Sequence, residues 1–307
     1  MEVIVADNAS TDDTAVWLAK NFPSVKLLQL EKNFGFAEGY NQAIARIGTE
    51  YVVLLNQDVE TSGDWISPLV DVLETNPNAA AVQPKIKAYK HKDKFEYAGA
   101  AGGYIDFLGY PFCRGRLFDT TEVDTAQYDS VQSVAWASGA CMLVRRSLYL
   151  SSGGLDKDLF AHMEEIDLCW RLKNFGYDIL CQPAATVYHL GGGSLPKGDP
   201  KKMYLNFRNN LALLAKNHSS PLIGLLFVRF WLDLLAALRF AINGSIPHAL
   251  AVIKAVFDFY KDYGKWMSKR AELKKSWHHP NRNGFYRNTI LWDFHARKAR
   301  TFQALRW

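Results

Sequence analysis

The chain has 307 residues, of which 49% are hydrophobic and 22% charged, a composition typical of one large globular domain with an appendage. It contains no repeat and no low-complexity tract, which excludes a solenoid or a disordered protein. Of its 36 basic and 31 acidic residues, 13 and 4 lie in residues 254–307. This tail therefore carries +9 and the rest −4, so only the tail favours an anionic partner.

The first 82 residues alternate short apolar runs with helical patterns, and this alternation predicts the fold class. Apolar strands separated by helices indicate an α/β fold with a largely parallel sheet that is covered on both faces. Ser10 and Asp13 have the spacing of a capping box for the first helix. The predicted strands are residues 3–6, 25–30, 51–55 and 79–82, and the predicted helices are residues 14–21, 37–47 and 65–75.

Polar side chains follow two of these strands. Asp7 and Asn8 come directly after the first strand, and Asn56 and Asp58 follow the third. Ligands of parallel α/β sheets bind beyond the carboxyl ends of the strands. We therefore expect these side chains to border a ligand site.

The middle of the chain is harder to interpret. Residues 97–110 are rich in glycine and aromatic residues and predict loops with short strands. None of the four cysteines forms a C-x-x-C pair, so we expect packed, reduced thiols and no zinc site. Further on we predict strands at residues 136–145, 178–182 and 186–189, and a helix at residues 165–175 that ends at Gly176.

The character of the sequence changes after Pro221, which divides the chain into a domain of residues 1–220 and a region of residues 221–307. Residues 222–242 are strongly apolar, but Arg229, Asp233 and Arg239 leave a charge-free run too short to span a bilayer. These charges and those of residues 249–265 each gather on one face of a helix. Two amphipathic helices before a basic, Trp-rich tail predict an interfacial membrane anchor. The alternative is packing on the α/β domain or on a second subunit.

Five segments, taken together and in order, resemble glycosyltransferase family 2, whose members are inverting enzymes with the GT-A fold, and in particular its rhamnosyltransferase-like members. They are distributed along roughly residues 1–210, and any one of them alone would be a weak signal. The five segments read VIVADNASTD, NFGFAEGYN, LLNQDV, SGACMLVRR and GLD with EEIDLCWR, and they begin at residues 3, 33, 54, 138 and 154.

The resemblance assigns a role to each candidate site residue. Asp58 is the expected ligand of Mg²⁺ or Mn²⁺ in the reduced motif Asn56-Gln57-Asp58, and His189, followed by glycines and Ser194, would complete the metal shell. Glu165 matches the family's catalytic base, and its neighbour Glu164 is expected to raise its pKa by repulsion. The nucleotide-sugar-binding residues implied by the resemblance are Asp7, Asn8, Asn41, Asn56 and Arg208.

The implied function is inverting transfer of a sugar from a nucleotide-diphosphate donor to a lipid-linked or polysaccharide acceptor in cell-surface glycan synthesis. The expected location is cytoplasmic, at the inner face of the plasma membrane, with an anionic membrane surface and no nucleic acid as partner. Family members begin with a further strand that cradles the base, and its absence here leaves an inactive sugar-nucleotide-binding remnant as the alternative. A nucleotidyltransferase would need a Gly-rich, basic loop after the first strand, and none is visible.

Overall fold

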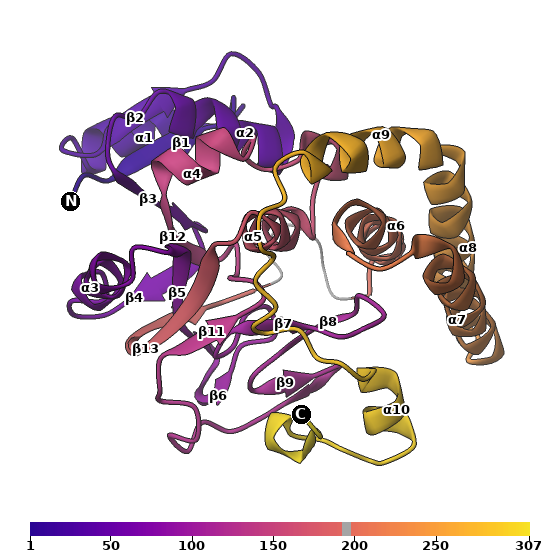
Figure 1. Ribbon diagram of the computed structural model, residues 1–307. Helices are drawn as coiled ribbons and strands as arrows, with labels where there is room; N and C mark the ends of the chain where they lie inside the picture. Colours follow the sequence, from indigo (N-terminus) through magenta and orange to yellow (C-terminus); the bar gives the residue numbers. More distant parts are fainter. Residues whose placement is uncertain (192–197) are drawn as a thin grey trace.

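A computed structural model describes residues 1–191 and 198–307 (Figure 1). The glycine-rich stretch predicted to follow His189 lies largely outside the described residues. The strands are β1 Ile4–Asp7, β2 Lys26–Gln29, β3 Tyr51–Leu55, β4 Val59–Thr61, β5 Ala79–Ala88, β6 His91–Phe95, β7 Gly103–Ile105, β8 Pro111–Cys113, β9 Arg116–Leu117, β10 Thr120–Thr121, β11 Gln132–Val134, β12 Cys141–Arg145 and β13 Asp178–His189.

The helices lie between these strands and then occupy most of the C-terminal third. They are α1 Thr14–Asn21, α2 Gly35–Ala45, α3 Ser67–Thr75, α4 Arg146–Ser151, α5 Glu164–Asn174, α6 Pro200–Asn217, α7 Leu222–Ile242, α8 Ile246–Lys261, α9 Tyr263–Lys274 and α10 Ile290–His295, with short 3₁₀ turns η1 Lys157–Leu159 and η2 Phe302–Ala304.

The central sheet confirms the predicted α/β class. Its order is β11-β13-β5-β12-β3, with β4 on β13 and β6 on β5. β12 is antiparallel to both β3 and β5, whereas β13 is parallel to β5. Strands β3, β5 and β13 thus share one direction with β12 reversed among them, so the sheet is mixed. The reversed strand is the one that the turn at Ser138 and Gly139 leads into.

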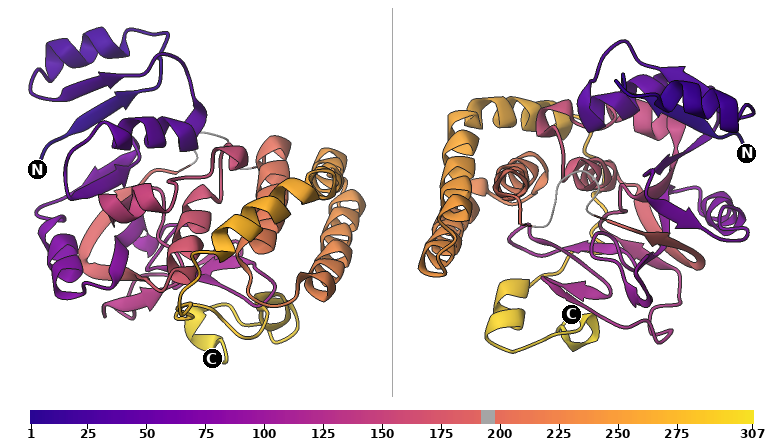
Figure 2. Two further views of the ribbon diagram at one scale, coloured as in Figure 1. Left: turned by 45° about the horizontal axis from the view of Figure 1, so that its top comes forward. Right: turned by 180° about the vertical axis from the view of Figure 1, so that it is seen from behind.

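The first strands form a unit of their own. β1 and β2 pair in parallel as a two-stranded sheet, and no pairing among the described residues joins them to β3. Figure 2 shows this unit, with α1, at the edge of the molecule opposite α7 and α8. Asp13 makes no side-chain cap for α1; instead Asp12 accepts from the Thr14 amide. The predicted capping box is therefore wrong.

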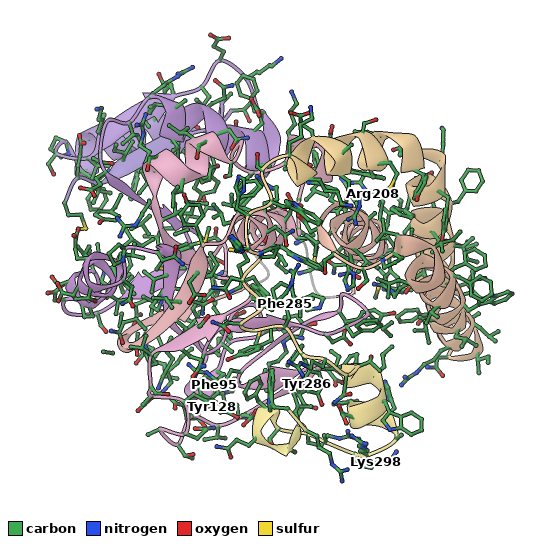
Figure 3. The ribbon with its side chains drawn as sticks, in the orientation of Figure 1. Phe95, Tyr128, Arg208, Phe285, Tyr286 and Lys298 are labelled. Carbon is green, nitrogen blue, oxygen red and sulfur yellow. The ribbon has the colours of Figure 1, made fainter. Side chains whose placement is uncertain are left out.

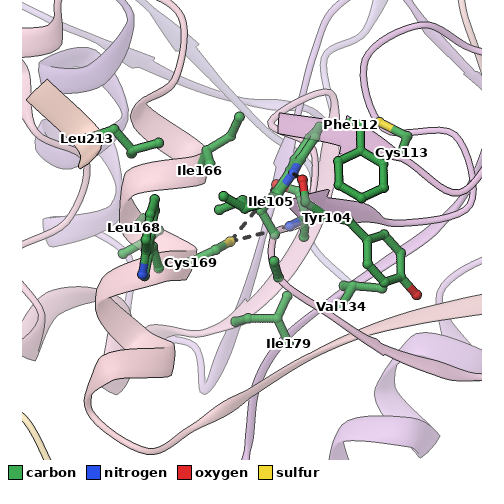
Figure 4. Packing of buried hydrophobic residues seen from close by; sticks show 14 of the residues in the cluster. Tyr104, Ile105, Phe112, Cys113, Val134, Ile166, Leu168, Cys169, Ile179 and Leu213 are labelled. Atoms are coloured by element: carbon green, nitrogen blue, oxygen red, sulfur yellow. Dashed lines mark hydrogen bonds between the residues drawn. The ribbon is translucent and has the colours of Figure 1, made fainter. Parts of the chain in front are cut away.

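Helix α5 is the buried element that fixes the centre of the molecule. Its side chains Ile166, Leu168 and Cys169 pack among buried residues of the neighbouring sheets, including Ile105 and Ile179 (Figure 4). All four cysteines are buried free thiols, as predicted. The two strands predicted at residues 178–182 and 186–189 are one strand, β13, whose register shifts after Gln182.

A buried charge network joins α5 to the helices that follow the α/β part. Asp167 accepts from Arg171, one turn further along α5, at 2.9 Å and from Lys216 of α6 at 2.8 Å. Lys216 and Lys269 of α9 both bond Asp156 at 2.5 Å. The bond from Lys269 to Asp156 crosses the boundary predicted at residue 220.

The C-terminal tail also packs on the α/β part. The Tyr286 amide donates to the Ile105 carbonyl at 2.8 Å, and the Ile290 amide donates to Asp106 at 3.0 Å. Trp266 is buried, so its predicted place at a membrane interface is wrong. Within the described residues, no helix has the length and apolar character needed to cross a bilayer.

Helix α7 is amphipathic in the opposite sense to the prediction. Arg229 and Asp233 are fully buried, and the Arg229 guanidinium bonds the Leu108 carbonyl at 2.8 Å and Asp233 at 3.3 Å. The charged face assigned to lipid headgroups therefore packs against the protein. The reason is that each buried charge finds a partner there, which a helix considered alone does not reveal.

Candidate active site

Strand pairing brings Asp58 and His189 together although 131 positions separate them. The short strand β4 begins directly after Asp58 and pairs antiparallel with the end of β13, with Val59 opposite His189. As a result His189 Nε2 lies 3.1 Å from Asp58 Oδ1, and the Leu190 amide donates to the Asp58 carbonyl at 3.0 Å. The two residues proposed from the sequence as metal ligands thus share one site.

Glu96 lies next to the Nδ1 atom of His189, and no role for it was predicted from the sequence. Its Oε1 lies 3.5 Å from His189 Nδ1, within ion-pair range, and its second oxygen accepts from the Ala98 amide. Burial lowers the pKa of His189, but Glu96 and Asp58 outweigh that effect, so the pKa is raised. Glu96 directly follows β6. It lies beside His189 because β6 pairs with β5 and β5 pairs with β13, which ends at His189. No spacing in the sequence signals such a relay.

The donor atoms of Asp58 and His189 suit Mn²⁺ or Mg²⁺, which take carboxylate oxygen and, for Mn²⁺, imidazole nitrogen. A carboxylate behind the imidazole is the usual outer partner of a metal-bound histidine, because it fixes the tautomer and the ring orientation. Within residues 1–191 and 198–307, no group of three or more His, Cys, Asp or Glu side chains is arranged to hold an ion. A cation here would therefore draw further ligands from a bound diphosphate or water.

The pair Glu164-Glu165 opens α5, one residue earlier than predicted. Glu164 is 4% exposed, and its Oε2 has no hydrogen-bond partner. Burial, and then repulsion from Glu165, raises the pKa of Glu164 well above its usual range. Glu165 is half-buried, and burial raises its pKa to about 7 against the opposing effect of backbone amides. The raised pKa of Glu165 is as predicted, but its main cause is burial and not repulsion.

The turn Ser138-Gly139-Ala140 connects the two halves of the site. A Cβ atom placed on Gly139 would lie 3.6 Å from the side chain of Glu165. On the other side, the Asn56 amide donates to the Ala140 carbonyl at 3.0 Å. The loop that carries Asn56 and Asp58 and the helix start that carries Glu165 therefore border one turn.

Asp7 and Asn8 organise the loop after β1. Asp7 is 6% exposed, and its Oδ1 accepts from the Ser10 amide at 2.9 Å. The Asn8 side chain accepts from the Phe34 amide at 2.9 Å and donates to the Gly35 carbonyl at 3.0 Å. Both side chains thus hold this loop against the start of α2, at the carboxyl end of β1 where the sequence placed them.

The side chain of Asn41 also forms hydrogen bonds with other parts of the protein. Its Oδ1 accepts from Tyr149 at 2.7 Å and from the Leu155 amide at 2.9 Å, and its Nδ2 donates to the Leu155 carbonyl at 2.8 Å. These bonds tie the second of the five segments to the fifth. The amide group is already occupied by the protein, so the geometry gives Asn41 a structural part in the site.

Comparison with known proteins agrees with this geometry. A family model described as glycosyl transferase family 2 matches residues 1–149. Over 264 residues the chain is 29% identical to N-acetylglucosaminyl-diphospho-decaprenol L-rhamnosyltransferase of Mycobacterium tuberculosis, and the match covers 80% of this chain and 81% of the relative. These matches make the chain a glycosyltransferase that is similar to glycosyl transferase family 2.

Other relatives of this glycosyltransferase are more distant. A low-salt glycan biosynthesis hexosyltransferase of Haloferax volcanii is 24% identical over 222 residues, which cover 70% of this chain and 67% of that protein. Among solved structures, GalNAc-T7 with UDP, GalNAc and Mn²⁺ is similar with a TM-score of 0.53 and 13% identity. The match covers 70% of this chain and 41% of that one, and it bears on the fold alone.

A strained segment leads into helix α5. Phe160, His162 and Met163 all have positive φ, between 65° and 75°, a region that side chains other than glycine rarely adopt. Such strain persists where the surroundings enforce it, and it concentrates at functional sites. The segment leads directly into Glu164 and Glu165, so it sets where the two carboxylates begin.

Helix α6 supplies the residues that hold this segment. The buried Asn209 donates through Nδ2 to the carbonyls of Leu159, Ala161 and His162 at 2.8–2.9 Å. Arg208 lies on the same helix (Figure 3) and donates to the Asp158 and Leu159 carbonyls at 3.1 Å. From the sequence, this guanidinium is expected at the diphosphate. In the structure it instead donates to backbone carbonyls in the segment before Glu164. The part that Asn209 plays in holding the backbone before α5 was not predicted, because it depends on contacts with residues about 50 positions away.

We expect Asn209→Ala to lower turnover by about 10²-fold, the usual cost of misplacing a catalytic group by about 1 Å. Nucleotide affinity should stay within about twofold, because the substitution leaves Asp58 and His189 in place. Steady-state kinetics and calorimetric titration would measure both. Asn210→Ala is the matched control: Asn210 is also buried, but it bonds the Gly109 carbonyl. Equal losses in the two variants would mean that Asn209 only supports the fold.

Proposed function

We propose that the protein transfers a sugar, with inversion, from a nucleoside-diphosphate donor to a hydroxyl of a lipid-linked or polysaccharide acceptor. The observation that carries this proposal is the pairing, across the turn at Gly139, of a half-buried glutamate with a raised pKa and an Asp–His pair at the strand ends. A base and a diphosphate-binding centre on opposite sides of one turn suit displacement at an anomeric carbon.

Glu165 is the base in this proposal. Its carboxylate takes the proton from the acceptor hydroxyl as that oxygen attacks the face of the sugar opposite the leaving diphosphate. Glu164 is less suited, because its carboxyl is almost fully buried and out of reach of a substrate. A pKa near the working pH gives a carboxylate both the ionised form and enough basicity to accept a proton.

Asp58 and His189 would hold Mg²⁺ or Mn²⁺ beside the diphosphate. A divalent cation bound there neutralises the charge that develops on the leaving group. Glu96 holds the His189 ring so that Nε2 faces Asp58. Asp7 and Asn56, at the ends of β1 and β3, would border the nucleotide.

The name of one relative supports the proposed acceptor. The mycobacterial relative is named for action on N-acetylglucosaminyl-diphospho-decaprenol, a lipid-linked acceptor. We therefore propose that the protein acts on precursors of cell-surface glycans. It would do so at the inner face of the plasma membrane, as a peripheral protein on an anionic surface. One observation favours a second candidate, a binding remnant without turnover: β1 and β2 are not joined to the central sheet.

A donor screen separates the two candidates. Uridine, guanosine and deoxythymidine diphosphate sugars would each be incubated with the protein, Mn²⁺ and a polyprenyl-diphosphate-linked acceptor, and release of the nucleoside diphosphate measured. We expect release that depends on the acceptor with one donor class. Tight donor binding without any release would favour the remnant.

Turnover should depend on pH through Glu165. A base acts when ionised, and burial raises the pKa of this group to about 7. We therefore expect turnover to rise with pH through about 7 and to fall about tenfold per unit well below it. A pH–rate profile under donor saturation measures this limb, and Glu165→Gln should remove it. An intact acidic limb in that variant would assign the titration to another group.

A further inference from the structure

Helix α7 carries an unbroken apolar stripe on the side that faces away from the protein. Its members recur every three or four residues, which places them along one face of the helix. Each is between 53% and 86% exposed. The stripe consists of Ile223, Phe227, Trp231, Leu235, Leu238 and Ile242.

Helix α8 packs beside α7 and continues the same kind of surface. Tyr260 of α8 donates to the Leu226 carbonyl of α7 and its ring contacts Phe230. Ile246, Leu250, Ile253 and Phe257 are 47–68% exposed on its outer side. We call this stripe and that of α7 together the hairpin face. Figures 1 and 2 place the two helices at the outer edge of the molecule, and Figure 3 shows side chains projecting from them.

The distribution of charged and apolar side chains on α7 differs from that of an ordinary surface helix. The charged pair Arg229–Asp233 is buried, and large apolar side chains face outward instead. A water-soluble monomer rarely exposes a contiguous apolar patch of this extent, so the hairpin face is an interaction surface. The remaining question is what covers it.

Cations lie at both ends of the stripe. Next to Ile223, a pocket of about 490 Å³ is lined by Arg270 and Lys274 of α9 and by Ser219 and Ser220. At the other end of the stripe, Arg239 of α7 lies near His295 of α10. Burial, and then the positive charge of Arg239, lower the pKa of His295, so the end of α7 lies beside α10. Exposed Trp292 and Arg297 belong to that region.

Helix α8 adds cations along its side. The side chain of Lys254 is 65% exposed and pairs with Asp258 on the same helix, and Lys261 is exposed at the end of α8. An apolar band bordered by Lys, Arg and Trp matches a bilayer whose acyl region meets anionic headgroups. A second copy of this chain would bring the same positive charges against each other.

We propose that the hairpin face inserts into the interfacial region of an anionic membrane, with the pocket at Arg270 and Lys274 and the α10 region meeting headgroup phosphates. The proposal rests on the proposed function only in that a lipid-linked acceptor gives the contact its purpose. Insertion of one helix face, and not of a spanning helix, would hold the protein on the surface while its α/β part stays in water.

The test is flotation of the full chain with vesicles, comparing two matched variants. Phe227→Gln with Trp231→Gln removes two residues of the hairpin face. Val16→Gln with Trp17→Gln removes a similarly exposed pair from α1, where Val16 and Trp17 are 72% and 52% exposed. Vesicles would contain either equal parts of phosphatidylglycerol and phosphatidylcholine or phosphatidylcholine alone. Sedimentation without lipid would report the oligomeric state.

We expect the protein and the α1 variant to float with the anionic vesicles, and the hairpin variant to bind them at least about tenfold more weakly, as loss of one buried aromatic side chain implies. Weaker binding to the neutral vesicles is also expected. Equal flotation of both variants would overturn the proposal, as would a lipid-free dimer that only the hairpin variant disrupts. Nucleotide release with a short-chain, water-soluble acceptor is measured in parallel. Flotation without release supports the hairpin face and defeats only the proposed function.

Discussion

Replacing Glu165 with glutamine should lower turnover by roughly 10²–10⁴-fold, the usual contribution of a placed general base. Glutamine keeps the shape of the side chain and its hydrogen bonding but cannot accept the acceptor proton. The donor dissociation constant should change little, because Glu165 acts on the acceptor and the diphosphate lies across the turn at Gly139. Single-turnover kinetics with saturating donor, together with calorimetric titration of the nucleotide, would separate the two quantities.

Glu164→Gln is the matched control, since it alters the neighbouring carboxyl in the same way. Glu164 is almost fully buried and its pKa is raised, so a neutral amide replaces a largely neutral acid there. We expect a smaller loss of turnover. If Glu164→Gln abolished transfer while Glu165→Gln retained it, the base would be Glu164. If neither substitution mattered, the pair would be only an acidic helix start.

Replacing Asp58 with alanine should weaken Mn²⁺-dependent nucleotide binding by at least about 100-fold. Asp58 offers the carboxylate of the two-ligand set, and even an outer partner of a metal site is worth roughly 10–100-fold in affinity. Glu96→Gln should therefore give an intermediate loss, because it changes only the group behind His189. Titration of the nucleotide with and without Mn²⁺ measures both variants, and Mn²⁺ electron paramagnetic resonance reports the bound ion directly.

Asp64→Ala controls for the loss of a nearby negative charge. Asp64 is an exposed carboxylate in the loop after β4, and it bonds the Ser67 amide without touching His189. Its substitution should leave Mn²⁺-dependent binding unchanged. Unaltered affinity in Asp58→Ala would assign the cation to other residues and would leave the Asp58–His189 contact a structural one.

The sequence was sufficient for those features that depend on local pattern and on chain order. Apolar runs separated by helical patterns predicted the α/β class, and polar residues after the strands predicted the site at Asp58. The pair Glu164-Glu165 was singled out by the resemblance to the family, whose base lies in such a pair at the start of a helix. His189 was proposed at the end of its strand, and the antiparallel pairing of β4 with β13 explains why it meets Asp58.

The remaining features depend on tertiary contacts that no local pattern reveals. The part played by Glu96 requires two successive strand pairings, and that of Asn209 requires a strained segment that lies far from it in the sequence. Helix α7 was interpreted with its charges outward because a helical wheel shows which residues share a face but not which face is covered. Only the contacts of Arg229 with Leu108 and Asp233 decide its orientation.

The anomeric configuration of the product formed by the wild-type protein is the most direct test of the proposed inverting transfer. Purified product from the active donor and a polyprenyl-linked acceptor would be analysed by nuclear magnetic resonance, with Glu165→Gln run in parallel. We expect a new glycosidic bond whose configuration is opposite to that of the donor, and almost no product from the variant. Product with retained configuration, or equal product from Glu165→Gln, would contradict it.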